Sequence, residues 1–240
     1  MDLQGKTVIV TGASSGIGEA AARAFAAAGA NVVLASRNRE ALTALAQELG
    51  DERALAVATD VTQRGQVDAL VERAVKRFGR LDVIVNNAGI GLRAGIADLD
   101  PAEFERLFQI NLMGPLYGMQ AAIRAMRKTG GGTIVNISSG TSRIVLPFLG
   151  GGYPALKRAL EVLSDYARAE LVNDGIKVLV VLPYLTATNF GKNALGRGGA
   201  PPPAFDLRNL PPAHSAEFVA NRIVEGVRNE ETEISLAPAR

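Results

Sequence analysis

The sequence predicts a doubly wound α/β fold, in which helices cover both faces of a parallel sheet. Short apolar runs alternate with longer amphipathic stretches along the whole chain of 240 residues. These runs are almost continuously apolar, as strands buried on both faces of a parallel sheet are. The expected strands are residues 6–10, 31–35, 54–58, 81–85, 132–137, 176–182 and 233–237. The chain is therefore expected to form a single seven-stranded, Rossmann-like domain over residues 1–240.

Helix signals fill the intervals between these strands. Asp100, Pro101 and Glu103 combine an N-cap, a first-turn proline and a capping box, and Gly175 suits the end of a later helix. Two long helices are predicted, over about 101–128 and about 153–172. The Gly- and Pro-rich segment 191–212 argues against regular structure there.

Composition excludes several function classes. The net charge is +2, with 26 basic and 24 acidic residues scattered along the chain, so no nucleic-acid partner is expected. The chain has no cysteine and one histidine, which excludes disulfides and zinc thiolates and leaves little for any other metal site. No apolar run reaches the length of a membrane span or a signal-peptide core. A soluble, cytoplasmic protein without a membrane partner is expected.

A glycine-rich turn follows the first strand. The sequence "TGASSGIG" at 11–18 places Gly12, Gly16 and Gly18 between a strand and a helix. Glycines there let the backbone approach a diphosphate, which the free N–H groups of the new helix attract. A plain tight turn is the alternative explanation. The expected cofactor contacts of this turn are Gly12, Ser14, Ser15, Gly16, Ile17 and Gly18.

The same residues also match a different class of site. Gly12, Ser14 and Gly16 fit the G-x-S-x-G elbow of a serine hydrolase, with Ser14 as nucleophile. That mechanism needs a later histidine, and His214 is the sole candidate. The elbow here follows the first strand, whereas those hydrolases use a central one. An ordinary residue ahead of the last helix explains His214 more simply.

The end of the second strand predicts the nucleotide. In such folds an acid at this point binds the ribose of NAD, whereas arginine suits the 2′-phosphate of NADP. Ser36 and Arg37 stand here without an acid, so NADP(H) is expected over NAD(H). The alternative is that Arg37 and Arg39 are a solvated loop pair. Asp60, followed by Val61, is placed to meet the adenine amino group.

The segment "GGGYPALK" at 150–157 places Tyr153 and Lys157 on one face of a helix start. On spacing alone, the pair could simply decorate that helix. In order, however, the chain contains "TGASSGIG", "DV" at 60–61, "NNAG" at 86–89, Asn111, Ser138-Ser139 and "YPALK". With these motifs it resembles the short-chain dehydrogenase/reductase family over nearly its whole length.

The resemblance implies a catalytic set of Asn111, Ser139, Tyr153 and Lys157. It also implies that the nucleotide is lined by Asn87, Ala88, Gly89, Tyr153, Lys157, Pro183, Thr186 and Thr188. A phenol is a reasonable proton donor for a ketone, and a lysine ammonium one helical turn away, together with an oxidised nicotinamide ring, is expected to lower its pKa from about 10. A homodimer or homotetramer is implied as well.

Several of these roles have alternatives in the sequence. Ser139 would hold the substrate carbonyl, although it also suits a turn, and Ser138 and Ser142 are rivals. Asn111 either holds a water beside Lys157 or is a core-edge residue bonded to backbone. A protein that binds NADP(H) without turnover, a sensor, is the non-enzymatic alternative.

The substrate side is less defined. A small carbonyl or alcohol compound is expected, with residues about 184–212 as a lid. Tyr184 stands where the family usually has glycine. Leu146, Phe148, Tyr184 and Phe190 suggest an apolar pocket, with Arg93 and Arg143 as anchors for a negative group. Core residues and solvated arginines explain these equally well.

Overall fold

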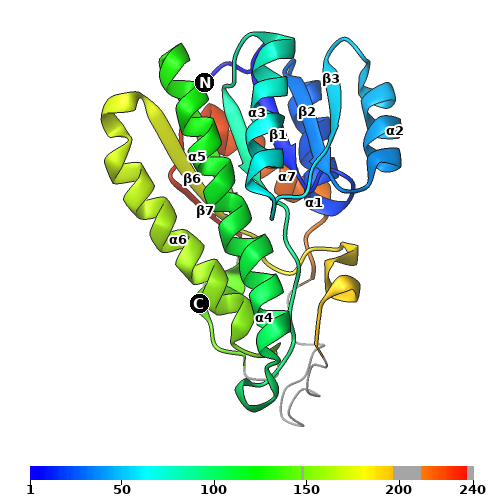
Figure 1. Cartoon of the computed structure of the whole chain (residues 1–240), viewed down its shortest axis with the longest axis vertical. Coiled ribbons are helices and arrows are strands. Elements are labelled where there is room, and N and C mark those ends of the chain that lie inside the picture. The colour runs from blue at the N-terminus through cyan, green and yellow to red at the C-terminus, as the bar shows by residue number, and fades with distance from the viewer. Residues whose placement is uncertain (147–148, 197–211, 237–240) are drawn as a thin grey trace.

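The computed structural model of the chain describes residues 1–146, 149–196 and 212–236 (Figure 1). Its centre is a parallel sheet of seven strands in the order β3-β2-β1-β4-β5-β6-β7. The strands are β1 Thr7–Thr11, β2 Asn31–Ser36, β3 Ala54–Ala58, β4 Val83–Asn86, β5 Gly132–Ile137, β6 Ile176–Leu182 and β7 Glu233–Ser235. The predicted fold class is confirmed, and each strand lies on a predicted run.

Helices cover both faces of this sheet, as Figure 1 shows. They are α1 Gly16–Ala27, α2 Arg39–Leu49, α3 Arg64–Phe78, α4 Pro101–Phe108, α5 Gly114–Met126, α6 Gly152–Glu170 and α7 Ala216–Arg228. Side chains of α1, α2 and α7 pack in one core with Val8 and Val10, while α3, α5 and α6 pack in another with Ile9. Both faces of β1 are thus buried, which explains its unbroken apolar run. No helix among the described residues is long and apolar enough to cross a membrane.

The strand order reverses direction between β1 and β4. From β1 the chain moves outward to β2 and β3, then returns to pair β4 with the other edge of β1, where Val10 is in register with Leu34 and Val85. Ligands of such sheets bind at the carboxyl ends of the strands where the order reverses. The glycine-rich turn and the segment after β4 both lie at this point.

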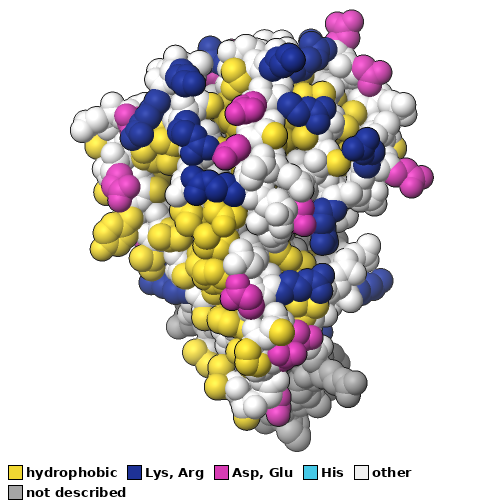
Figure 2. Space-filling view, in the orientation of Figure 1, with side chains coloured by type: hydrophobic (Ala, Val, Ile, Leu, Met, Phe, Trp, Pro, Cys, Tyr) yellow, Lys and Arg dark blue, Asp and Glu magenta, His cyan; other side chains and the backbone are white. Residues whose placement is uncertain are grey.

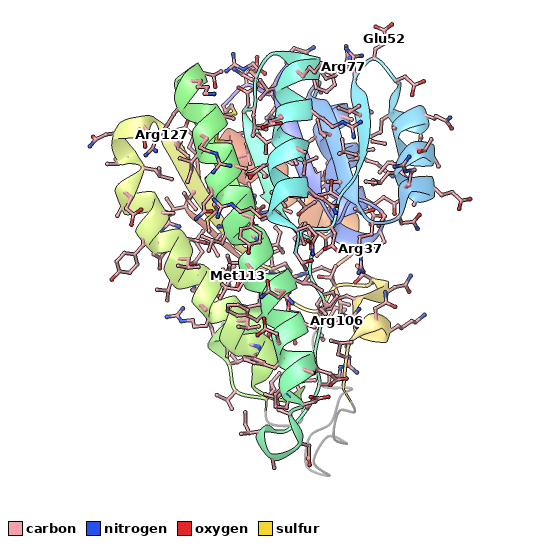
Figure 3. All side chains as sticks on the ribbon, in the orientation of Figure 1. Arg37, Glu52, Arg77, Arg106, Met113 and Arg127 are labelled. Carbon is pink, nitrogen blue, oxygen red and sulfur yellow. The ribbon has the colours of Figure 1, made fainter. Side chains whose placement is uncertain are left out.

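The helix expected over about 101–128 is formed, but one of its turns is not α-helical. Residues Gln109–Met113 form a π-helical turn between α4 and α5, and Met113 marks its end in Figure 3. Hydrogen bonds from the Asn111 side chain to Ile90 O and Leu107 O hold this wider turn. A single π-helical turn displaces the apolar pattern by only about one residue, so the pattern did not reveal it.

The segment 191–212 is also more regular than expected where it is described. Residues Asn189–Asn193 form a 3-10 helix, and Leu195 pairs with Leu92 in an isolated parallel bridge. Backbone hydrogen bonds link Leu195 to Gly91 and Arg93. The remainder, 197–211, lies outside the described residues, as does Phe148. The second long helix is confirmed as α6, followed by a 3-10 turn that ends at Gly175, whose φ is 66°.

Candidate active site

The glycine-rich turn is built around close contacts between backbone segments. Gly12 has a φ of 68°, and a Cβ there would lie 2.8 Å from Asn87 Nδ2. A Cβ on Gly18 would lie 2.3 Å from Gly12 O, too close for any larger residue. The turn therefore requires glycine, and the free N–H groups at the start of α1 face the carboxyl edge of the sheet.

The other residues of the turn differ in the exposure and the contacts of their side chains. Ile17 is partly buried and packs against the core beneath α1. Ser15 is the N-cap of α1, but its side chain makes no capping hydrogen bond. Ser14 precedes it and is half-buried. Across the turn, the Thr188 side chain lies 3.2 Å from the position of a Cβ on Gly16.

A cavity of about 540 Å³ opens between this turn and the segment after β6. Its lining comes from the start of α1, from residues 187–192 and from the start of α7. Gly16 and Thr188 both line it, together with Lys192. The charged residues of the lining are mixed, with Arg23 and Lys192 against Glu19 and Glu217. The feature that favours an anion here is therefore the set of free backbone N–H groups at the start of α1.

Thr11 fastens the segment after β4 to β1. Its Oγ1 accepts hydrogen bonds from Asn87 N at 3.0 Å and Ala88 N at 3.1 Å, and donates to Val85 O at 3.2 Å. Asn87 Nδ2 donates in return to Thr11 O at 2.9 Å. Thr11 was not among the predicted site residues, although it begins the motif at 11–18. Its hydroxyl sets the distance between the two segments expected to line the nucleotide.

The Asn86 side chain is buried between the sheet and the helices α5 and α6. Its Nδ2 donates to Asn136 Oδ1 on β5 at 2.8 Å, and Asn136 Nδ2 donates to Ser164 Oγ on α6 at 2.8 Å. A Cβ on Gly118 would lie 2.2 Å from Asn86 Oδ1, so α5 approaches this pair closely. These buried groups tie β4, β5 and two helices together.

The residues predicted to meet the adenosine lie at the far end of the same edge. Arg37 directly follows β2 and is exposed (Figure 3), and among the described residues it makes no ion pair. Ser36 Oγ accepts a hydrogen bond from Asn38 N at 3.1 Å. Asp60 Oδ1 accepts from Thr62 N at 3.0 Å and from Thr62 Oγ1 at 2.8 Å.

Val61 lies against the start of α5, and Gly89 lies against the π-helical turn that precedes α5. A Cβ on Gly114 would lie 3.0 Å from Val61 Cγ2, so Val61 packs on the first turn of α5. A Cβ on Gly89 would lie 2.8 Å from Asn111 Oδ1 and 3.7 Å from Lys157 Nζ. Gly89 thus leaves room for two polar side chains to approach each other.

The two polar atoms of the Asn111 side chain differ in their hydrogen bonding. The Nδ2 group donates to Ile90 O at 3.0 Å and to Leu107 O at 3.1 Å. The Oδ1 atom is buried and has no hydrogen-bond partner within the described part of the chain. The backbone therefore satisfies the amide nitrogen, and the oxygen lies near Lys157; that it holds a water there stays a prediction.

Tyr153 and Lys157 lie together in the first turns of α6. Lys157 is 3% exposed, and its Nζ donates to Ile137 O at 2.8 Å and lies 5.7 Å from the centre of the Tyr153 ring. Burial lowers the pKa of Lys157 to about 8. Desolvation disfavours the charged form of this lysine, so its pKa lies closer to neutral pH than that of an exposed lysine.

Burial also raises the pKa of Tyr153 above its ordinary value, and a hydrogen bond to the Ser139 side chain acts in the opposite direction. The prediction that Lys157 and an oxidised nicotinamide ring together lower this pKa concerns the cofactor-bound protein and stays a prediction. Leu92, Leu156 and Leu195 belong to the apolar cluster around Tyr153, and the Phe190 ring lies 5.6 Å from its ring. Desolvation in these surroundings outweighs any attraction from Lys157.

Of the three serines after β5, Ser139 is the one whose side chain acts to lower the pKa of Tyr153. It caps the 3-10 turn Gly140–Arg143, and its Oγ lies 2.8 Å from Thr141 Oγ1. The rivals Ser138 and Ser142 are instead bonded to the carboxylate of Glu161. The geometry therefore separates Ser139 from both of them.

The segment after β6 crosses the mouth of the site. Pro183 O accepts a hydrogen bond from Gly140 N at 2.8 Å, next to Ser139. Thr186 forms a parallel bridge with His214, and its Oγ1 donates to Tyr184 O at 2.9 Å. Thr188 Oγ1 accepts from Phe190 N at 3.3 Å, at the start of the 3-10 helix.

The expected pocket residues are only partly brought together. The Tyr184 ring meets His214 edge-on at 6.4 Å, and of the two expected aromatics that the structure describes, Phe190 is the one beside Tyr153. Arg143 forms ion pairs with Glu161 and Glu233, which favours a structural role over a substrate anchor. Arg93 is exposed and borders Gly191.

His214 does not serve Ser14. Its ring lies between those of Tyr184 and Phe218, 4.7 Å from the latter, and within the described ranges no hydrogen bond joins it to Ser14. In the turn at 11–18, the glycines instead allow two backbone segments to approach closely, at Gly12 and Gly18. The site thus combines a diphosphate-binding turn with a tyrosine, a lysine and a serine, which together define a nicotinamide-dependent oxidoreductase.

Comparison with known proteins agrees with this class. The family model of short chain dehydrogenases matches residues 6–196, and the chain belongs to that family. Dehydrogenase/reductase SDR family member 7B of Bos taurus is 38% identical over 201 residues, which are 80% of this chain and 62% of the bovine protein. The chain thus spans under two thirds of that relative.

Two solved structures share the fold. A 3-ketoacyl-(acyl-carrier-protein) reductase from Brucella melitensis, in complex with NADH, has a TM-score of 0.85 and 28% identity over 98% of both chains. An alcohol dehydrogenase from Thermococcus sibiricus, in complex with 5-hydroxy-NADP, has a TM-score of 0.80 and 27% identity over 97% of this chain and 95% of that one. The chain is a dehydrogenase or reductase with a nicotinamide cofactor, and the serine hydrolase alternative is wrong.

The buried Lys157 gives a stability prediction. Because its pKa is lowered from 10.5 to about 8, the unfolded chain holds a proton between these values that the folded chain lacks. Stability should therefore rise with pH in this window. The free energy of unfolding of wild type minus that of Lys157→Met is expected to increase by about 1 kcal/mol per pH unit. Urea denaturation between about pH 8 and pH 10 measures it, and a decrease would contradict the burial of a lysine ammonium.

Proposed function

We propose that this protein is an NADP(H)-dependent oxidoreductase that interconverts a ketone or aldehyde and the corresponding alcohol. The observation that carries the proposal is the meeting of Ser139, Tyr153, Lys157 and Asn111 beside the glycine-rich turn. The two similar solved structures, by their names, belong to a ketoacyl reductase and an alcohol dehydrogenase. Both names support chemistry at a carbonyl or alcohol group.

In the proposed reduction, the nicotinamide supplies a hydride to the carbonyl carbon. Ser139 donates a hydrogen bond to the carbonyl oxygen and stabilises the negative charge that develops there. Tyr153 gives its phenolic proton to that oxygen, and the product is an alcohol. Burial favours the neutral phenol, which is the form that can donate this proton.

The tyrosine must regain a proton after each reduction. Lys157 lies one helical turn from Tyr153, and its Nζ and the unbonded Asn111 Oδ1 both lie near the Cβ position of Gly89. A water bonded to Asn111 Oδ1 would continue a path from Lys157 toward solvent. We infer that these two residues return the proton, in line with the family resemblance.

The residues present fit the cofactor. The turn at Gly12, Gly16 and Gly18 would hold the diphosphate, with Thr188 closing over it, and Asn87 to Gly89 would line the nucleotide. In this proposal Pro183 and Thr186 would meet the nicotinamide, and Asp60 and Val61 would meet the adenine. The preference for NADP(H) rests on Arg37 beside Ser36, with no acid to repel a phosphate.

For the substrate we propose an apolar carbonyl compound. The Phe190 ring covers one side of Tyr153, and the apolar cluster of Leu92, Leu107 and Leu156 lies beneath it. We propose that residues about 184–212 act as the lid. Its described part is fastened at the Leu92–Leu195 and Thr186–His214 bridges.

A turnover test examines the proposed reaction. Loss of NADPH absorbance is followed with a panel of small ketones, diketones and quinones. Tyr153→Phe is expected to lower kcat by at least about 10²-fold, because the proton donor is lost while the ring remains. Tyr166→Phe is the matched control and should retain wild-type rates, since Tyr166 lies exposed on the same helix. NADPH binding without turnover on any carbonyl would favour the sensor.

Arg37 is tested through cofactor preference. Arg37→Ala is expected to lower kcat/KM for NADPH by about tenfold or more and to leave NADH nearly unchanged, since only NADPH carries the 2′-phosphate. Arg39→Ala removes a neighbouring exposed charge and serves as control. An equal loss in both variants would assign the effect to general positive charge rather than to Arg37.

We also propose a homodimer or homotetramer. Figure 2 shows apolar side chains gathered over α5 and the adjoining part of α6. On α6, Val162 is 44% exposed and Tyr166 67% exposed. Large apolar patches on a soluble domain commonly mark interfaces. Sedimentation should give at least twice the mass of the 25.1 kDa chain, and Val162→Asp should lower it; a wild-type monomer would refute the assembly.

A further inference from the structure

A buried carboxylate lies directly behind the proposed catalytic residues. Glu161 follows Lys157 by one helical turn on α6, and its side chain is 2% exposed. A carboxylate is rarely buried to this degree unless other groups satisfy it. None of the steps proposed above uses Glu161.

Four side chains satisfy this carboxylate. Ser138 Oγ donates to Oε1 at 2.6 Å, and Ser142 Oγ donates to the same oxygen. Arg158 donates to Oε2 at 2.7 Å and Arg143 at 3.1 Å. One oxygen therefore receives the two serines and the other the two arginines.

The surroundings keep Glu161 ionised. Burial by itself would raise its pKa, but hydrogen bonds from Ser138, Ser142, Arg158 and Arg143 outweigh that effect and hold the pKa below its usual value. Arg143 also pairs with Glu233 on β7, at 2.8 and 2.6 Å. The carboxylate thus joins α6 to the turn after β5 and, through Arg143, to the edge of the sheet.

These contacts flank Ser139 on both sides. Ser138 precedes it, and Ser142 Oγ lies 2.6 Å from Ser139 O, so the single Ser142 proton is available to that carbonyl or to Glu161. Ser138 Oγ also lies 3.3 Å from Lys157 O. The backbone on either side of Ser139 is therefore attached to the helix that carries Tyr153 and Lys157.

We propose that Glu161 is a positioning residue: it holds the 138–143 turn against α6 and thereby fixes the Ser139 hydroxyl relative to the Tyr153 hydroxyl. The inference rests on the proposed function, because it requires Ser139 and Tyr153 to act on the same oxygen. A displacement of about 1 Å between such groups can lower a rate by about 10²-fold. A charged network is suited to this task because its hydrogen bonds are directional, whereas apolar packing is not.

The test is a double-mutant cycle between Glu161 and Ser139 under single-turnover conditions, with NADPH and the best substrate of the carbonyl panel. Glu161→Ala is expected to lower the rate of hydride transfer by about 10- to 100-fold, with the Kd for NADPH within about twofold of wild type. Glu161→Gln keeps an oxygen for the serines and should lose less. In a Ser139→Ala background, Glu161→Ala should change the rate by less than about twofold, because its effect passes through Ser139.

Controls separate this role from stability alone. Asp165→Asn changes an exposed ion pair on the same helix and should leave the rate unchanged. If Glu161→Ala does not fold, Ser142→Ala removes one link of the network and should show the same dependence on Ser139, with a smaller loss. Thermal denaturation of each variant shows whether the compared proteins are folded.

Two results would overturn the inference in different ways. A Glu161→Ala loss that is equal in both backgrounds, or no loss at all, refutes positioning by Glu161 while leaving the Ser139 role intact. A wild-type rate in Ser139→Ala would refute the proposed function and the inference together.

Discussion

Desolvation of two neighbouring ionisable groups, Tyr153 and Lys157, is the constraint on which the active site depends. Burial raises the pKa of the phenol and lowers that of the lysine, so both groups are pushed toward their neutral forms. In a buried site, water does not replace a misplaced hydrogen-bond partner. Proton exchange between this pair and a substrate therefore requires that the neighbouring groups hold both side chains accurately. The Lys157 side chain is held by the hydrogen bond from its Nζ to Ile137 O, which attaches α6 to the end of β5.

The parallel sheet brings the remaining groups to the same edge. The turn after β1, the segment after β4 and the turn after β5 all lie at the carboxyl ends of their strands. Thr11 holds the first two together through its hydroxyl, and Glu161 is proposed to hold the third to α6. Each link is a buried polar contact between segments far apart in sequence. Together they explain how a site made of loops can be rigid.

Much of this could be predicted from the sequence because the relevant signals are local. Continuous apolar runs identified the strands, and glycines at 12, 16 and 18 identified a turn whose close contacts admit no side chain. The spacing of Tyr153 and Lys157 needed only the helical repeat. These features depend on residues a few positions apart.

The features that escaped prediction depend on distant partners. The π-helical turn at 109–113 is held by a bond from Asn111 to Ile90 O, some 20 residues earlier. The direction of the Tyr153 pKa follows from the apolar cluster around it, which is assembled from several segments. Tyr184 contacts His214, about 30 residues later in the sequence. Pattern and spacing carry no information on such contacts.

The ionisation of Tyr153 tests this account most directly. Tyrosine labelled with ¹³C at the ζ carbon gives only four signals in this chain, and Tyr153→Phe assigns the relevant one. With the protein alone, Tyr153 is expected to stay protonated well beyond the range in which ordinary tyrosines ionise, near pH 10. Addition of NADP⁺ should move its ionisation to lower pH, because an oxidised nicotinamide adds positive charge nearby. A Tyr153 that already ionises below pH 10 in the protein alone would contradict the claim that desolvation controls the proton donor.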